Sequence, residues 1–267
     1  MATKEKQQKL CIVKLEDLPN EVILKVLGNL GMEDLFACAK LSRRFKCVSQ
    51  DESLWLKMNI SLRKLPMSYL LRVLDNGCKY LSLYHSRIRA ETGTSDDFIL
   101  RKPCQLRYLD FSFCKAFDNC ILERILVSCN SLQKLSLVRI SLRCDMIHGI
   151  CTKNSSTITT LDLSSAKFYE SHIGTYRNYF KTIIKNCNRL TELNLSYTDL
   201  HREDIPFLVT NLTETIEKLN LASIKGIYIK FNPFFLNGVS NSMMRLDYSY
   251  QTSQKSLGYL TTLDFEF

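Results

Sequence analysis

The chain has 267 residues, 45% hydrophobic and 24% charged, which is the composition of an ordinary globular protein. No apolar run approaches the roughly 20 residues that span a bilayer, and the charged opening MATKEKQQKL does not form a signal peptide. We therefore expect no membrane segment and a location in the nucleus, the cytoplasm or both. The net charge of +9 is spread among interleaved acidic and basic residues, which favours a solvated surface and leaves nucleic-acid binding as the minor alternative.

The first predicted elements are helices, in a block that follows a flexible basic tail at residues 1–14. We place helices at about 20–29, 33–40 and 42–50, with Asp17 or Asn20 capping the first. In the stretch LEDLPNEVILKVLGNL, the apolar residues of the first helix cover an arc of roughly 200°, about twice what packing on one core requires. An exposed apolar face of that size usually marks a protein interface.

From residue 61 to 267 a phrase of the form Leu-x-x-Leu-x-Leu recurs. The first leucines of the L-x-L pairs lie at intervals of 28, 26, 26, 32, 26, 27 and 17 residues. Apolar residues between the phrases have helical spacing, and before the last helix Asp204 can cap while Pro206 fits a first turn. Each unit is therefore strand, turn and helix, and the units stack with strands on a concave face. These leucines are Leu81, Leu109, Leu135, Leu161, Leu193, Leu219, Leu246 and Leu263.

Residues that alternate with these leucines are expected to face solvent on the concave side. The middle column, which we expect to be a solvated polar ladder, comprises Ser82, Asp110, Ser136, Asp162, Asn194, Asn220 and Asp247. Tyrosines of the early units and basic residues of the later ones are better candidates for contacts. The candidate substrate-binding residues are Tyr80, Tyr84, Tyr108, Asp110, Lys134, Asp162, Glu192, Asn194, Lys218 and Arg245. About six extra residues within 164–180 form either a binding loop or a longer convex turn.

The eleven cysteines do not indicate a disulfide framework or a metal site. There is no CxxC pair, and the four histidines are scattered. Cys104, Cys129 and Cys187 keep nearly the same phase in the repeat, as expected for small apolar residues at a buried corner. The sequons at Asn59, Asn154, Asn194 and Asn211 are coincidences of composition. With no P-loop, GxSxG or HExxH motif either, we expect no cofactor, no metal and no catalytic residues.

Residues 15–60 resemble an F-box. The resemblance rests on Leu18-Pro19, Glu21 and the apolar residues of the first helix, and on Asp34-Leu35, Arg44-Phe45 and Leu54-Trp55, in the order and spacing of that family. With the repeats behind it, the chain resembles F-box/leucine-rich-repeat proteins, and DESLW, CNRLTELNLS and TETIEKLNL are similar to their S-phase kinase-associated protein 2 type. The resemblance implies an α+β fold: a three-helix F-box (15–60), then an α/β leucine-rich-repeat solenoid (61–267) with a parallel sheet on its concave face. About eight repeats are expected, the last ones irregular or shortened.

The resemblance also implies a function, that of the non-catalytic substrate-recognition subunit of a Skp–cullin–F-box ubiquitin ligase, a class that acts in the cell cycle. The partners implied are the Skp adaptor, through it a cullin and a RING protein, and a protein substrate. The adaptor-binding residues carried over are Leu18, Pro19, Glu21, Ile23, Leu24, Leu27, Leu30 and Leu35. Periodicity leaves open which face of the helix is outward, so some of these residues could instead hold the helices together. The alternative function is a stand-alone repeat scaffold that binds protein or RNA, with the helical block as its cap.

Overall fold

The computed structural model describes residues 14–89, 100–116, 119–169, 179–224 and 245–246. The chain divides between Trp55 and Leu56 into two compact units, a helical one and one that combines strands and helices. From the sequence we expected this boundary later in the chain, at residue 60. The reason is that Lys57–Asn59 already forms strand β1 and pairs with β3, although KMN contains no L-x-L phrase.

The helical unit contains the three predicted helices with slightly shorter bounds and two additional short elements. The elements are η1 (Leu15–Asp17), α1 (Asn20–Leu27), α2 (Met32–Cys38), α3 (Arg43–Ser49) and α4 (Glu52–Trp55). The predicted cap of α1 is wrong, because Pro19 occupies the capping position and no side chain caps the helix. The Asp17 carboxylate instead accepts a hydrogen bond from the backbone N–H of Lys14, at 3.3 Å.

Aromatic residues close the core of the helical unit. The rings of Phe36 and Trp55 lie 5.1 Å apart, and both side chains are buried. The indole N–H of Trp55 donates to the carbonyl of Ser49 at 2.7 Å, so the polar atom of the buried tryptophan is satisfied. At the start of α3, the Ser42 hydroxyl accepts from the N–H of Phe45 at 3.2 Å and caps the helix.

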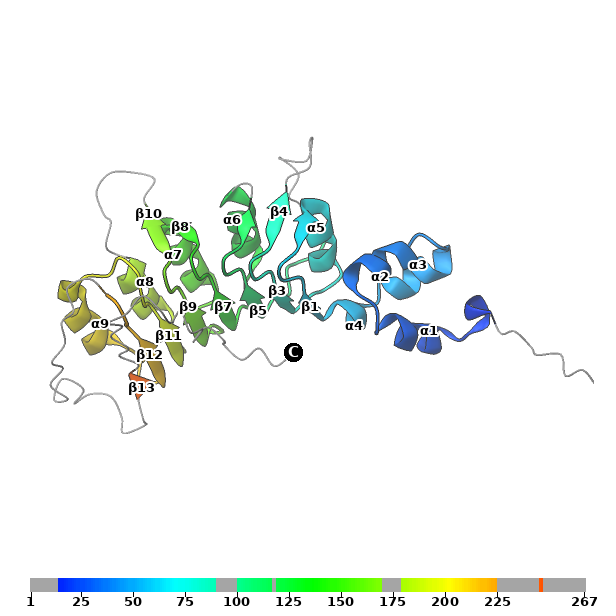
Figure 1. The fold of residues 1–267 in the computed structure, drawn as a ribbon. Coiled ribbons are helices and arrows are strands. Elements are labelled where there is room, and N and C mark those ends of the chain that lie inside the picture. Colours follow the sequence, from blue (N-terminus) through cyan, green and yellow to red (C-terminus); the bar gives the residue numbers. More distant parts are fainter. Residues whose placement is uncertain (1–13, 90–99, 117–118, 170–178, 225–244, 247–267) are drawn as a thin grey trace, which may run out of the picture. The chain divides into compact units, whose positions relative to one another are not determined.

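The second unit is built on an eight-stranded parallel sheet in which every strand neighbours the next one along the unit (Figure 1). Its leucines stand in register, with Leu81 opposite Leu109, and Leu109 opposite Leu135. Seven of the eight predicted leucines lie in these strands, and Leu263 lies outside the described residues. The strands are β1, β3 (Tyr80–Ser82), β5 (Tyr108–Asp110), β7 (Lys134–Ser136), β9 (Thr160–Asp162), β11 (Glu192–Asn194), β12 (Lys218–Asn220) and β13 (Arg245–Leu246).

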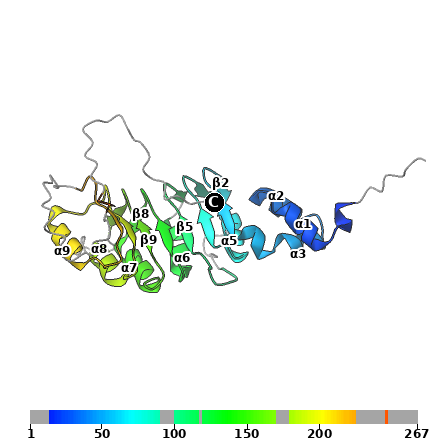
Figure 2. The same cartoon turned by 90° about the horizontal axis from the view of Figure 1, so that it is seen from below.

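Helices line one side of this sheet (Figures 1 and 2). They are α5 (Met67–Asp75), α6 (Asn119–Ser128), α7 (Cys144–Lys153), α8 (Tyr179–Asn186), η2 (Arg202–Asp204) and α9 (Ile205–Asn211). Pro206 lies in the first turn of α9 as predicted. Asp204 occupies the predicted capping position, but its side chain makes no capping bond to α9, and its carboxylate accepts from the N–H of His201. Two small parallel sheets, which the sequence did not indicate, combine β2 (Lys64–Pro66), β4 (Arg87–Arg89) and β6 (Lys115–Ala116), and β8 (Ser141–Arg143) with β10 (Lys167–Tyr169).

Seven strands of the sheet, from β1 to β12, end in the same turn, which contains the fourth residue after the central residue of each strand. The residue there has a left-handed backbone without being glycine, with φ between 53° and 62°. Such a conformation is costly for an L-residue, and the sheet hydrogen bonds hold it in place. For example, the N–H of Phe113 donates to the carbonyl of Val138 at 2.9 Å. The left-handed residues are Leu62, His85, Phe113, Arg139, Ser165, Tyr197 and Ser223.

The middle polar column supports these turns and is not the solvated ladder that we expected. The carboxylate of Asp110 accepts from the N–H of Ser112 at 2.9 Å and from the hydroxyl of Ser82 at 3.3 Å. The carboxylate of Asp162 likewise accepts from the N–H of Ser164 and from the side-chain amide of Asn194, and this residue is only 6% exposed. The expectation failed because small polar side chains on adjacent strands bond to each other and to the turn, and these bonds bury them. Asp247 lies outside the described residues.

The cysteines predicted at a buried corner are buried. Cys104, Cys129 and Cys187 are at most 5% exposed, and the sulfur atoms of Cys104 and Cys129 are 3.5 Å apart. Burial also raises the pKa of the Cys114 thiol to about 12, so it is protonated at neutral pH. These side chains therefore act as core residues.

Candidate functional site

Helix α1 presents two different apolar faces. Ile23 and Leu27, one turn apart, are at most 1% exposed and point into the helical unit. Val22 and Val26, also one turn apart, are 40% and 42% exposed. The four-residue spacing continues to half-buried Leu30 beyond the helix. The surplus apolar arc seen in the sequence is therefore real, and Val22 and Val26 are its outward part.

The residues proposed for adaptor binding divide between these faces. Ile23, Leu27 and Leu35 lie in the core of the helical unit, with at most 2% exposure. This burial disagrees with the prediction that they bind the adaptor: they hold the helices together, and a helical period alone cannot distinguish the inward stripe from the outward one. Leu18, Leu24 and Leu30 are half-buried, while Pro19 and Glu21 are exposed. We define the outer apolar face as Leu18, Pro19, Val22, Val26 and Leu30.

Arg44 of α3 holds the start of this face in place. Its guanidinium donates to the carbonyl oxygens of Glu16 and Leu18 and, at 2.8 Å, to the Oδ1 atom of Asn20. A planar guanidinium with several fixed N–H groups suits a segment that offers several oxygens at once. The Leu-Pro segment is thus tied to α3. The Arg-Phe pair was part of the sequence resemblance, but this contact could not be read from it.

The sheet presents a second cluster at the start of its first four strands. Lys57, Tyr80, Tyr108 and Lys134 are register partners on β1, β3, β5 and β7. The Tyr80 and Tyr108 rings meet edge to face at 4.6 Å. The Lys57 ammonium lies 5.5 Å from the centre of the Tyr80 ring, and the Lys134 ammonium lies 5.3 Å from that of Tyr108. We call these four residues the cation–aromatic row.

A third cluster lies in the turns at the other end of the same strands. His85 stacks on Phe113 with ring centres 6.3 Å apart, and Tyr84 meets Phe113 edge to face at 5.5 Å. The Arg139 guanidinium lies 5.4 Å from the centre of the Phe113 ring. We call Tyr84, His85, Phe113 and Arg139 the turn cluster. Of these residues the sequence reasoning named only Tyr84, because left-handed positions without glycine leave no sequence signal.

The remaining substrate candidates are distributed over the later strands. The Lys218 ammonium pairs with the Glu192 carboxylate at 2.6 Å across β11 and β12. Asn194 is half-buried and, like buried Asp110 and Asp162, bonds to its own turn. These three polar side chains present little surface to a partner. Arg245 lies on β13, and the segment with extra residues, 164–180, lies partly outside the described residues.

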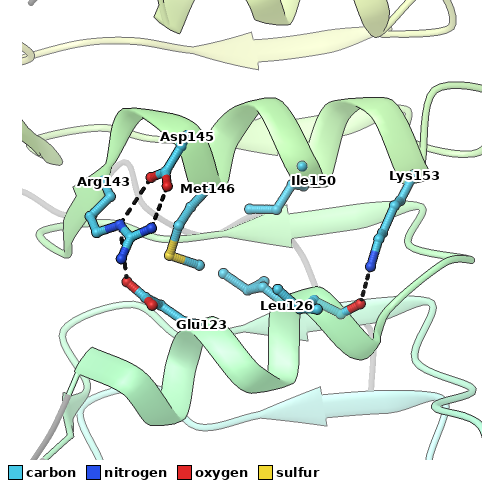
Figure 3. A pocket seen from close by; sticks show the side chains of 9 residues that line it. Glu123, Leu126, Arg143, Asp145, Met146, Ile150 and Lys153 are labelled. Carbon is cyan, nitrogen blue, oxygen red and sulfur yellow. Dashed lines mark hydrogen bonds and ion pairs between the residues drawn. The ribbon is translucent and has the colours of Figure 1, made fainter. Parts of the chain in front are cut away.

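A small pocket of about 140 Å³ lies between α6 and α7 (Figure 3). Its charged rim is internally neutralised, because Arg143 pairs with Asp145 and, at 3.7 Å, with Glu123. This pairing holds the pKa of the Asp145 carboxyl below its usual range. At the other end the Lys153 ammonium donates to the carbonyl of Val127 at 2.6 Å. We interpret the pocket as the seam between two packed helices, floored by Leu126, Met146 and Ile150.

Within the described parts of the chain, no group of three or more histidine, cysteine or acidic residues is placed to hold a metal ion. In the same parts, the helices are too short or too polar to cross a membrane. The outer apolar face and the two clusters on the sheet are therefore the features that a function must explain.

The helical segment that carries the outer apolar face matches a family model along residues 15–61, and the chain thus contains an F-box-like domain.

Proposed function

We propose that this protein is the substrate-recognition subunit of a Skp–cullin–F-box ubiquitin ligase. The observation that carries the proposal is the outer apolar face on an F-box-like domain, with Val22 and Val26 about two-fifths exposed. F-box domains bind Skp-type adaptors, and an unpartnered apolar stripe is the surface that such an adaptor would cover. Through the adaptor the chain would reach a cullin and a RING protein.

We further propose that the second unit is a leucine-rich-repeat solenoid, which would hold a protein substrate. The proposal is supported by the in-register leucines, by the recurring left-handed turn and by helices on one side of a parallel sheet. The role is one of proximity, because a substrate held on the same complex as the conjugating enzyme reacts as if at a high local concentration. The chain itself would form no bonds. Similarity to the S-phase kinase-associated protein 2 type stays a prediction.

Co-purification with the Skp adaptor tests the proposal. The intact chain is compared with Val22→Ser/Val26→Ser and with Leu18→Ala/Pro19→Ala. Losing the contacts of two valines should weaken the complex by about 2–4 kcal/mol, enough to abolish co-purification. The control is Leu62→Ser/Val127→Ser, which removes two exposed apolar side chains elsewhere and should leave the complex intact.

If the intact chain captures no adaptor while circular dichroism shows it folded, the proposal is wrong. The alternative, a repeat scaffold that binds protein or RNA, would then gain weight. RNA binding in particular would weaken steeply with rising salt, because it releases counterions.

A further inference from the structure

The cation–aromatic row and the turn cluster lie on the same early strands and bear similar chemistry. Tyr80 begins β3 and Tyr84 lies in the turn that follows this strand, so the two features lie at opposite ends of the same strands, at most about 13 Å apart. From Lys57 to Lys134 the row crosses three strand spacings, about 14 Å. Together they form one patch with a basic residue at each end of the row and Arg139 in the turn cluster.

The charges of this patch are of one sign. Its two lysines and one arginine each lie over a tyrosine or phenylalanine ring, which orients the cation and leaves N–H groups for a second partner. The acidic residue between the two features, Asp110, is buried and bonded to Ser82 and Ser112. Burial also raises the pKa of its carboxyl. On the later strands, by contrast, Lys218 is paired with Glu192.

We infer that this patch is the substrate-docking site of the protein and that it binds an acidic peptide segment lying across β1 to β7. Carboxylates of the peptide would meet Lys57 and Lys134 at the ends of the row, and its apolar or aromatic side chains would pack on Tyr80 and Tyr108. A separation of about 14 Å corresponds to two acidic residues four positions apart in an extended peptide. The inference rests on the proposed receptor function and specifies its substrate class.

The test uses the full chain in complex with the adaptor and three labelled seven-residue peptides. One has two glutamates four positions apart with a tyrosine between them, the second has glutamine in place of both glutamates, and the third has the two glutamates adjacent. Of the three peptides, the first should bind with the highest affinity in fluorescence anisotropy. The affinity of the first peptide for Lys57→Gln/Lys134→Gln should be about tenfold or more lower than its affinity for the parent protein. Its affinity for Lys57→Arg/Lys134→Arg should be unchanged, because that variant retains the charge.

The control is Lys115→Gln/Lys167→Gln, which removes the same charge from exposed positions on the small sheets. Equal losses in the control and the row variant would overturn the inference, as would equal binding of the glutamate and glutamine peptides or no binding at all. A labelled 20-nucleotide RNA provides one further arm. If RNA binds the row while the acidic peptide does not, the site is not a peptide site. Adaptor capture is scored separately with every variant, so that failure of the docking site is distinguished from failure of the receptor function.

Discussion

At the scale of single residues, Asn154 illustrates how the repeated units are joined. Its side chain is fully buried, and its Oδ1 atom accepts from the N–H of Leu132 at 2.8 Å. Its amide donates to the carbonyls of Cys129 and Ile150 at 3.3 and 3.0 Å. This burial leaves the asparagine of the sequon inaccessible in the folded protein. The sequence could show the motif, but not that this asparagine joins neighbouring units.

Asn154→Ala should therefore be strongly destabilising. It leaves a buried N–H and two carbonyls without their partner, which costs about 1–3 kcal/mol of the free energy of unfolding and more if the site cannot relax. Urea denaturation of the variant measures this loss. The neighbouring change Thr152→Ala, at an exposed position of α7, which Asn154 directly follows, should stay within about 0.5 kcal/mol of the parent. Equal stability of the two variants would show that the buried bonds contribute little.

Asp162 predicts a pH dependence of stability. Burial raises the pKa of its carboxyl above the ordinary value of about 4, so the folded protein retains this proton longer than the unfolded chain does. The contribution of Asp162 to stability is therefore greatest below pH 4 and declines as the pH rises through the folded-state pKa. Asp162→Asn, which stays neutral, should be relatively more stable at pH 7 than at pH 4.

Urea denaturation at several pH values between 4 and 7 measures this difference. Glu217→Gln, which removes an exposed carboxyl from the same unit, serves as the control. The opposite trend for Asp162→Asn, with its relative stability falling towards pH 7, would mean that the ionised carboxylate stabilises the turn.

At the scale of elements, the contact between α3 and the Leu-Pro segment gives a prediction about Arg44. Arg44→Ala removes the donor that ties Glu16, Leu18 and Asn20 to α3. The segment should then sample other conformations, and adaptor affinity should fall about tenfold because the bound geometry is no longer preorganised. Arg43→Ala is the matched control, since it removes a neighbouring exposed arginine. An unchanged affinity for Arg44→Ala, measured by calorimetry, would assign Arg44 no positioning role.

Among the elements, helices and strands were predictable where one period dominates. The L-x-L phrases located seven strands of the parallel sheet, and the spacing of Tyr179, Phe180, Ile183 and Ile184 located α8. Strand β1 was missed because Met58 takes the place of the usual leucine phrase. The outward stripe of α1 was also missed: periodicity revealed too much apolar surface, but only packing shows that Val22 faces out and Ile23 faces in.

At the scale of the whole molecule, the sequence predicted an α+β chain with a helical block before a parallel sheet, and the structure has this order. The match of residues 15–61 to the F-box-like model agrees with the resemblance drawn from the sequence. The candidate sites were less predictable. The contacts that define them join residues about 26 positions apart, as in Tyr108 and Lys134, and their burial depends on neighbours that one sequence cannot place.

The central claim is that an apolar face of the F-box-like domain is covered by a Skp adaptor. Isothermal titration calorimetry of the intact chain with the purified adaptor, at several temperatures, tests it most directly. We predict tight binding with a negative heat-capacity change, because apolar surface leaves water, and a smaller change for Val22→Ser/Val26→Ser. Binding without a negative heat-capacity change, or binding unaffected by the two substitutions, would contradict the claim.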